Sequence, residues 1–309
     1  MENFLINEIA LVSYFNGKNN IDLNIAFAID ENYIIPSGVL LFSILKNNSN
    51  LNIHFHIFTT CDDMDKFCNF KKFNADITIY VLNENYFSSL QTPGHFSPAI
   101  YYRVAIPYVL EGKVDNILYI DADVLCVSSL QELTLIDISD YYIAAVEDLG
   151  MSKNDVRNLG MLGKYFNSGV MIINVEKWIV NDIFNKFMSL VNERVFAYPD
   201  QDALNILFDE NILYISNKYN HFTEIESEEA VLVHYVGWLK PWSMAADNNE
   251  TYLHYYSDSP FKSIPLQSPV NYKLAKRLAR KYIKNNQIIK SVKWYFLYFF
   301  MKMKNKLKS

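Results

Sequence analysis

The sequence predicts an α/β fold, in which a mixed, mostly parallel sheet is flanked by helices and followed by a helical extension rich in basic and aromatic residues. Three observations predict it. Short β-type apolar runs alternate with helical patterns, an order typical of βαβ units. Only nine Gly accompany 22 Tyr and 21 Phe among 309 residues, which indicates a well-packed core. Residues 271–309 hold twelve Lys or Arg and no Asp or Glu, against 16 basic and 34 acidic residues before them.

Residues 23–82 predict one helix among three strands. Pro36 lies near the start of the helix, where proline is favoured, and apolar residues follow it at helical spacing. The flanking apolar runs have the length and composition of strands. We expect strands at residues 23–29, 51–58 and 77–82 and a helix at 36–46, and we make no structural prediction for residues 1–22.

The run at residues 51–58 alternates between apolar and polar side chains. His54 and His56 share the polar face, because residues two apart in a strand point the same way. This pair has no apparent third ligand, so we favour a solvated face over a metal site.

Further elements continue the alternation of strands and helices. Arg103 belongs to a run with an apolar helical face, and Asn167, Ser168 and Gly169 interrupt an apolar run. Asp200 is a natural N-cap for the short helix that follows it. We expect helices at residues 97–110, 178–194 and 203–208 and strands at 142–146, 165–175 and 231–237.

The chain is organised around the apolar run 116–124, which contains Asp121 and Asp123 at its end. In a strand these carboxylates point the same way, and their convergence is costly unless a cation or a proton neutralises them. Oxygen ligands favour a hard divalent ion such as Mg²⁺ or Mn²⁺; a plain strand-end turn is the alternative. Ligands of open α/β sheets bind at the carboxyl ends of strands, so we expect Asp30, Asn32 and Tyr33 on the same rim.

Composition restricts the cellular setting. The longest apolar runs fall well short of the roughly 20 residues that a membrane-spanning helix needs, and the first residues lack the basic segment of a secretory signal. Cys61, Cys68 and Cys126 show no metal-binding spacing, which is typical of a reduced compartment. We therefore expect a cytoplasmic protein.

The tail at residues 271–309 has the pattern of a segment that lies on a membrane surface. Leu274, Leu278 and Tyr282 form one apolar stripe of a basic helix, and the aromatic run 294–301 lies among lysines that extend to Lys308. Basic residues interleaved with aromatics suit the surface of an anionic bilayer. The rest of the chain is acidic overall and resembles no nucleic-acid-binding module, which argues against nucleic acid as a partner. A basic helix docked on the acidic body is the alternative.

Five separated segments of the chain match one family. A lone Asp-x-Asp motif is weak, but five segments in family order across residues 24–245 are specific. The chain resembles glycosyltransferase family 8, retaining enzymes of GT-A fold that use nucleotide sugars, and within it most closely the bacterial lipopolysaccharide-core glucosyl- and galactosyltransferases. The matching segments are residues 28–33, 119–124, 165–170, 198–202 and 234–242.

The resemblance implies a metal ion and a UDP-sugar. Asp121, Asp123 and His234 would bind Mn²⁺ or Mg²⁺, and the imidazole favours Mn²⁺. Taken alone, a histidine in an apolar strand is more often a core residue. For Tyr33, a core aromatic is the alternative. The ion would act as a Lewis acid on the departing UDP. Implied diphosphate contacts are Gly237 and Lys240, and the implied nucleotide pocket comprises Ala28, Asp30, Asn32, Tyr33 and Ala122.

The resemblance also implies the residues of the reaction centre, namely Gln201, Asp200 and Lys240. Because an amide is a poor nucleophile, we favour front-face substitution, in which the leaving phosphate deprotonates the acceptor hydroxyl. Asp200 and Asp202 remain candidate nucleophiles. Without the resemblance, Asp202 is a first-turn acid favoured by the helix dipole, and Arg103 a salt-bridged surface residue. Implied donor-sugar contacts are Arg103, Asn167, Ser168, Asp200 and Gln201.

The loop after His234 departs from the family pattern. Trp238 and Leu239 stand where relatives usually carry small residues or proline, which puts the shape of the acceptor in doubt. The expected organisation is a GT-A domain at residues 20–250 and a membrane-associating helical extension at 251–309. The expected function is transfer of glucose or galactose from a UDP-hexose to a lipopolysaccharide core, at the cytoplasmic face of the inner membrane. A glycogenin-like self-glucosylating enzyme and a non-catalytic sugar-binding scaffold are the alternatives.

Overall fold

The chain forms two compact units, Met1–His234 and Tyr235–Ser309. The computed structural model describes residues 4–15, 20–88, 90–92, 97–161, 163–209, 211–222, 229–247 and 249–306. Lys308 of the predicted tail lies outside the described residues.

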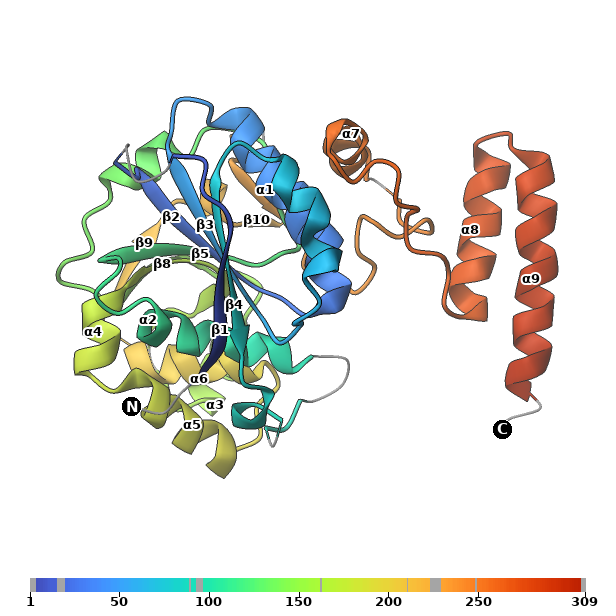
Figure 1. Ribbon diagram of the computed structural model, residues 1–309. Helices are drawn as coiled ribbons and strands as arrows, with labels where there is room; N and C mark the ends of the chain where they lie inside the picture. The colour runs from blue at the N-terminus through green and yellow to red at the C-terminus, as the bar shows by residue number, and fades with distance from the viewer. Residues whose placement is uncertain are drawn as a thin grey trace. The chain divides into compact units, whose positions relative to one another are not determined.

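The first unit is built on an eight-stranded sheet with the strand order β1-β4-β3-β2-β5-β8-β7-β9 (Figure 1). Strands β4, β3, β2 and β5 run parallel to one another, whereas β8 runs antiparallel to both β5 and β7. The predicted mixed α/β sheet is thereby confirmed. The strands are β1 (Leu5–Val12), β2 (Leu23–Ala28), β3 (Ile53–Thr59), β4 (Asp76–Leu82), β5 (Asn116–Ile120), β7 (Ile143–Glu147), β8 (Phe166–Asn174) and β9 (Ile212–Ile215).

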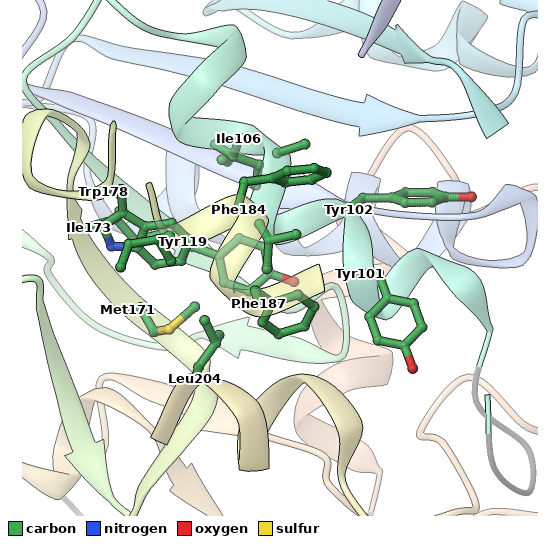
Figure 2. Close-up of a cluster of buried hydrophobic side chains, with 14 of the residues drawn as sticks. Tyr101, Tyr102, Ile106, Tyr119, Met171, Ile173, Trp178, Phe184, Phe187 and Leu204 are labelled. Carbon is green, nitrogen blue, oxygen red and sulfur yellow. The ribbon is translucent and has the colours of Figure 1, made fainter. Parts of the chain in front are cut away.

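Helices cover both faces of this sheet. On one face, side chains of β5 and β8 such as Tyr119 and Met171 pack against Trp178, Phe184 and Phe187 (Figure 2). Helix α1, which buries Leu40 and Ile44 among other residues, lies on the other face (Figure 1). The helices of this unit are α1 (Ile34–Asn47), α2 (Ile106–Val109), α3 (Lys153–Asn158), α4 (Val175–Val180), α5 (Ile183–Glu193) and α6 (Pro199–Phe208).

A small second sheet brings distant segments together. Its strands are β6 (Val124–Cys126), β10 (His221–Phe222) and β11 (Leu232–His234), in the order β10-β11-β6. In its register His234 lies opposite Val124 and beside Phe222. The strand predicted at residues 231–237 is thus shorter than expected, and it ends at the residue that faces the carboxylate turn.

Three predicted helices differ from those observed. The segment predicted as a helix at 97–110 is a 3₁₀ helix, Pro98–Ala105, followed by the short α2, because Pro107 has no N–H for the carbonyl of Arg103. The helix predicted at 178–194 is two helices, α4 and α5, separated at Asp182, whose φ is 52°. Helix α6 begins at Pro199 with Tyr198 as its N-cap, so the prediction of Asp200 as the cap is wrong.

The solvated face predicted for His54 and His56 is wrong for His56 and holds only in part for His54, which is partly exposed. His56 is only 2% exposed, and its ring nitrogens lie 3.1 Å from the Tyr80 hydroxyl and 3.1 Å from Asn24 Oδ1. His54 Nε2 lies 2.9 Å from Thr78 Oγ1. Strand β3 is an inner strand of the parallel part of the sheet, and such strands are covered on both faces.

The second unit contains α7 (Glu250–Asp258), α8 (Tyr272–Lys284) and α9 (Ile288–Lys306). Helices α8 and α9 lie side by side (Figure 1). The predicted stripe is used inside this unit, because Leu274 and Leu278 are buried with Ala245 and pack against Leu239 and Trp294. Among the residues that the structure describes, no helix is both long enough and apolar enough to span a bilayer.

Candidate active site

The two carboxylates lie in a turn between β5 and β6. Asp121 accepts the turn hydrogen bond from the N–H of Val124 at 3.1 Å and donates its own N–H to the carbonyl of Gly169 at 2.7 Å. Strands β5 and β2 are parallel, with Ala26 opposite Tyr119. The carboxyl ends of both strands therefore share one edge of the sheet, as predicted, although the carboxylates converge through a turn and not through strand alternation.

His234 completes a cluster of three metal-ligand types. Donor atoms of Asp121, Asp123 and His234 all lie within 4.8 Å of one another. His234 is 4% exposed, and its Nε2 lies 3.2 Å from Oδ1 of Asp123. Two carboxylate oxygens and an imidazole nitrogen are a donor set that fits a divalent cation.

The electrostatics of the cluster also favour a cation. Burial raises the pKa of the Asp121 carboxyl, Arg103 opposes this rise, and the charge of Asp123 adds to it. A raised pKa means that the charged carboxylate is disfavoured where it stands. A bound cation would lower that pKa and stabilise both carboxylates in their charged form.

Arg103 joins the carboxylate turn to helix α6. Its guanidinium is buried, with Nη2 2.8 Å from Asp121 Oδ1 and Nη1 3.1 Å from Asp200 Oδ2. Nη1 also donates to the carbonyl and to the hydroxyl of Ser168, each at 2.9 Å. Burial alone would lower the pKa of Arg103, but Asp121 and Asp200 raise it above its ordinary value. The alternative of a surface salt bridge is excluded, since this ion pair is internal.

Gln201 is held by hydrogen bonds that use both ends of its amide. Its oxygen accepts from the N–H of Ser168 at 3.0 Å and from Nδ2 of Asn167 at 2.9 Å. Its Nε2 donates to Oδ2 of Asp148 at 3.1 Å. Asn205, one turn further along α6, bonds both backbone groups of Phe166 and so fixes α6 against β8. The structure therefore brings the predicted sugar contacts Arg103, Asn167, Ser168, Asp200 and Gln201 into one continuous network.

Asp202 is engaged by protein groups at both oxygens. Oδ1 accepts from the hydroxyl of Tyr165 at 2.5 Å, and Oδ2 accepts from the N–H of Tyr198 at 3.0 Å. Burial raises the pKa of this carboxyl, while the Tyr165 and Tyr198 hydrogen bonds lower it. These contacts describe a residue that holds the start of α6, and they favour the structural alternative over a nucleophile.

The predicted nucleotide residues lie along the same edge. Asp30 caps the 3₁₀ helix Glu31–Tyr33 by accepting from the N–H of Asn32 at 2.8 Å. The pKa of Tyr33 is raised by burial first and then by the charges of Asp123 and Asp121, which lie near its ring. Ala28 ends β2, and Ala122 is buried between the two carboxylates.

Gly237 and Lys240 belong to the second unit, and their part in diphosphate binding stays a prediction. Within that unit, Nζ of Lys240 donates to the carbonyl of Tyr235 at 2.7 Å. Trp238 is 68% exposed, whereas Leu239 packs towards α8.

Three further polar or backbone contributors to this site were not predicted from the sequence. Asp148 follows β7 at the carboxyl edge of the sheet, and the rule that identified Asp30 would have found it. A Cβ at Gly169 would displace the ring of His234, since a built Cβ meets Cε1 of His234 at 2.3 Å. Asn220, whose Oδ1 lies 2.8 Å from Nδ1 of His234, carries no motif that would have identified it.

The chain is similar in sequence to known glycosyltransferases over most of its length. The family model described as glycosyl transferase family 8 matches residues 24–246, and the model of the C-terminal region of family 8 matches residues 249–302. Lipopolysaccharide glucosyltransferase WaaO of Escherichia coli K12 is 28% identical, with 93% of each chain covered. Lipopolysaccharide 1,3-galactosyltransferase of Salmonella typhimurium is 28% identical, with 91% of each chain covered.

Solved structures agree with this similarity. A crystal structure of galactosyltransferase LgtC in complex with donor and acceptor sugar analogues has a TM-score of 0.71 and 25% identity, and it covers 77% of this chain and 96% of the other. The similarity extends over the edge of the sheet that carries the carboxylate turn, since the family match includes every residue from Asp30 to Lys240. The chain belongs to glycosyl transferase family 8.

Proposed function

We propose that this glycosyltransferase transfers glucose or galactose from a UDP-hexose to a lipopolysaccharide core oligosaccharide, with retention of configuration and with Mn²⁺ or Mg²⁺. Support for the hexose and the acceptor comes from relatives described as lipopolysaccharide glucosyl- and galactosyltransferases. The observation that carries the proposal is the convergence of Asp121, Asp123 and His234 within 4.8 Å at the carboxyl edge of the sheet.

The proposal gives each group of predicted residues a task. Asp121, Asp123 and His234 would hold the ion, which when bound neutralises charge on the departing diphosphate. Ala28, Asp30, Asn32, Tyr33 and Ala122 would bind the nucleoside, and Gly237 and Lys240 the diphosphate.

The contacts of α6 support front-face substitution. Asp200 is ion-paired with Arg103 and accepts from the hydroxyl of Ser168 at 2.9 Å, so it is suited to orienting groups. The amide of Gln201 is held on both sides and is a poor nucleophile. In the proposed step, the anomeric carbon of the sugar forms a bond to the acceptor oxygen while the bond from the same carbon to the departing phosphate breaks. Both events take place on the same face of the sugar. The acceptor proton passes to the departing phosphate oxygen.

Turnover of a panel of UDP-sugars by the purified protein tests this function. We expect Mn²⁺-dependent release of UDP from UDP-glucose or UDP-galactose, faster with a truncated lipopolysaccharide core as acceptor, and no release in the presence of EDTA. Asp123→Asn should lower turnover by at least about 10³-fold, since it removes several kcal/mol of charge stabilisation. Asp62→Asn, an exposed carboxylate elsewhere, is the control. Equal turnover by Asp123→Asn would overturn the proposal, and labelled sugar found on the protein itself would indicate self-glucosylation.

We further propose that α9 places the enzyme on an anionic membrane. Its outward apolar residues follow helical spacing and are 59–88% exposed, while the opposite side of the helix buries Ser291 and Tyr298. Exposed lysines border this apolar face, and each contributes about 1 kcal/mol near an anionic surface. The apolar face consists of Ile288, Ile289, Val292, Phe296, Phe299, Phe300 and Met303, and the lysines are Lys293, Lys302, Lys304 and Lys306.

Co-sedimentation with vesicles tests the membrane proposal in the full-length chain. We expect binding to phosphatidylglycerol vesicles that falls at least about tenfold in a Phe296→Ser, Phe300→Ser double variant. Leu135→Ser, an equally exposed apolar residue of the first unit, is the matched control. Equal binding by the double variant, or equal binding to neutral phosphatidylcholine vesicles, would contradict the proposal.

A further inference from the structure

We infer that Asn220 is a positioning residue that fixes the tautomer of His234, so that Nε2 presents a lone pair to the cation. The inference deepens the proposed function and rests on its metal site. It follows from a chain of hydrogen bonds whose direction is set at one end by a backbone N–H.

The direction of these linked hydrogen bonds is set at Gly169. The N–H of Gly169 donates to Oδ1 of Asn167 at 3.0 Å, and a backbone N–H can only donate. The Asn167 amide is therefore oriented with its oxygen towards Gly169 and its nitrogen towards Gln201, whose oxygen accepts at 2.9 Å. The oxygen of Gln201 is assigned independently by the N–H of Ser168, which donates to it at 3.0 Å.

The linked hydrogen bonds continue to His234 through Asn220. Nδ2 of Asn220 donates to Oδ1 of Asn167 at 2.7 Å, so the Asn220 oxygen is the atom that faces Nδ1 of His234, at 2.8 Å. An oxygen acceptor at this distance requires the proton on Nδ1. In the neutral ring Nε2 then carries a lone pair, 3.2 Å from Oδ1 of Asp123. A cation held by both atoms would resolve the repulsion between them.

The position of Asn220 is itself fixed by its surroundings. Asn220 is 3% exposed, and the 3₁₀ helix Asn217–Tyr219 precedes it directly. Glu132 holds that helix, since its carboxylate accepts from Nζ of Lys218 at 2.6 Å and from the hydroxyl of Tyr219 at 2.5 Å. Strand β10 follows Asn220 and pairs with β11, the strand that ends at His234. Both ends of the Asn220–His234 hydrogen bond are thus tied to the same small sheet.

The chain of amides links the metal ligand to the sugar side of the site. It runs from His234 through Asn220 and Asn167 to Gln201, and the last two are predicted donor-sugar contacts. A substitution at Asn220 should therefore change the affinity for the metal without removing any metal ligand. Residues that orient a metal-bound histidine typically change metal affinity by about 10–100-fold when they are lost.

Equilibrium dialysis of Mn²⁺, with UDP on both sides of the membrane, tests the inference. We expect Asn220→Leu, which has similar size but no polar atoms, to raise the Kd of Mn²⁺ by about 10–100-fold. Asn220→Asp keeps the acceptor for Nδ1–H and should return the Kd towards the wild-type value. An unchanged Kd in Asn220→Leu would overturn the inference. No Mn²⁺ binding by the wild type would instead overturn the proposed metal site.

A spectroscopic measurement on the wild type does not depend on the folding of any variant. The two tautomers can be distinguished by long-range ¹H–¹⁵N spectra of metal-free protein labelled with ¹⁵N-histidine. The spectra are recorded at a pH at which imidazole is neutral. We expect the proton of His234 on Nδ1, with assignment by the loss of its signals in His234→Gln. A proton on Nε2 would overturn the inference, and a role in packing alone does not predict either tautomer.

Discussion

Two regions of the first unit contain buried histidines, and only one of them is arranged to hold a cation. His234 faces Asp123, and its other nitrogen faces an amide oxygen that requires a proton there. His54 and His56 lie with ring centroids 4.0 Å apart, and their nitrogens lie near hydroxyls and an amide oxygen. The difference shows that burial of histidine does not indicate a metal site. Convergence of two carboxylates and an imidazole nitrogen within 4.8 Å is what favours one here.

Burial disfavours charge in both regions, but the groups it acts on differ. It raises the pKa of the Asp121 carboxyl beside His234 and lowers the pKa of both His54 and His56. A cation near Asp121 would neutralise a buried negative charge, whereas protonation of His54 or His56 adds a buried positive one.

The largest expected effect tests the charge balance of the first region. Arg103→Lys replaces a guanidinium that contacts Asp121, Asp200 and Ser168 with an ammonium that cannot reach all three. Because buried carboxylates then lose their partner, we expect the free energy of unfolding to fall by about 3 kcal/mol. Urea unfolding measures this, with the exposed Arg194→Lys as control. A loss no greater than that of the control would contradict the internal ion pair.

The next effect tests the geometry of the first region. Gly169→Ala places a Cβ 2.3 Å from Cε1 of His234, so the ring must move by about an ångström or more. A displacement of this size near a reacting centre costs about 10²-fold in turnover. We expect that loss of turnover, and we expect half-maximal turnover to need a higher Mn²⁺ concentration than in the wild type. Gly163→Ala, where the nearest atom lies 3.7 Å away, should behave like the wild type. Full activity of Gly169→Ala would show that His234 need not lie where it does.

The smallest expected effect is a pH dependence of stability that arises from His54 and His56. The pKa values of His54 and His56 are lowered in the folded protein, so between those values and about 6.5 the unfolded chain binds more protons. Stability therefore falls as pH drops below about 6.5, by up to about 1.4 kcal/mol per pH unit for each histidine. His56→Gln should reduce this pH slope, measured from urea midpoints at several pH values. An unchanged slope would exclude the pair as its source.

Local patterns predicted much of the site. The carboxylate turn, the rim residue Asp30 and the segment around Asn167 each stand out in the sequence, and parallel strand order places strand ends at one edge. Asn220 could not be predicted, because its contact with His234 depends on the pairing of β10 with β11 and on the direction of amide hydrogen bonds. Neither is encoded in a short motif.

The failed predictions have a common physical origin in tertiary context. Alternation in β3 predicted a wet face for His54 and His56, but an inner strand of a parallel sheet is covered on both sides. Leu274 and Leu278 gave the correct helix in the tail, yet that stripe packs inside the second unit and the outward apolar face belongs to α9. Periodicity indicates which residues share a face, and only the fold shows what covers that face.

The number of Mn²⁺ ions bound per chain in the presence of UDP tests the central claim most directly. We expect one ion for the wild type, one for His54→Gln, and none for Asp123→Asn at the Mn²⁺ concentration that saturates the wild type. Mn²⁺ that remains bound after Asp123→Asn, or that is lost after His54→Gln, would contradict it.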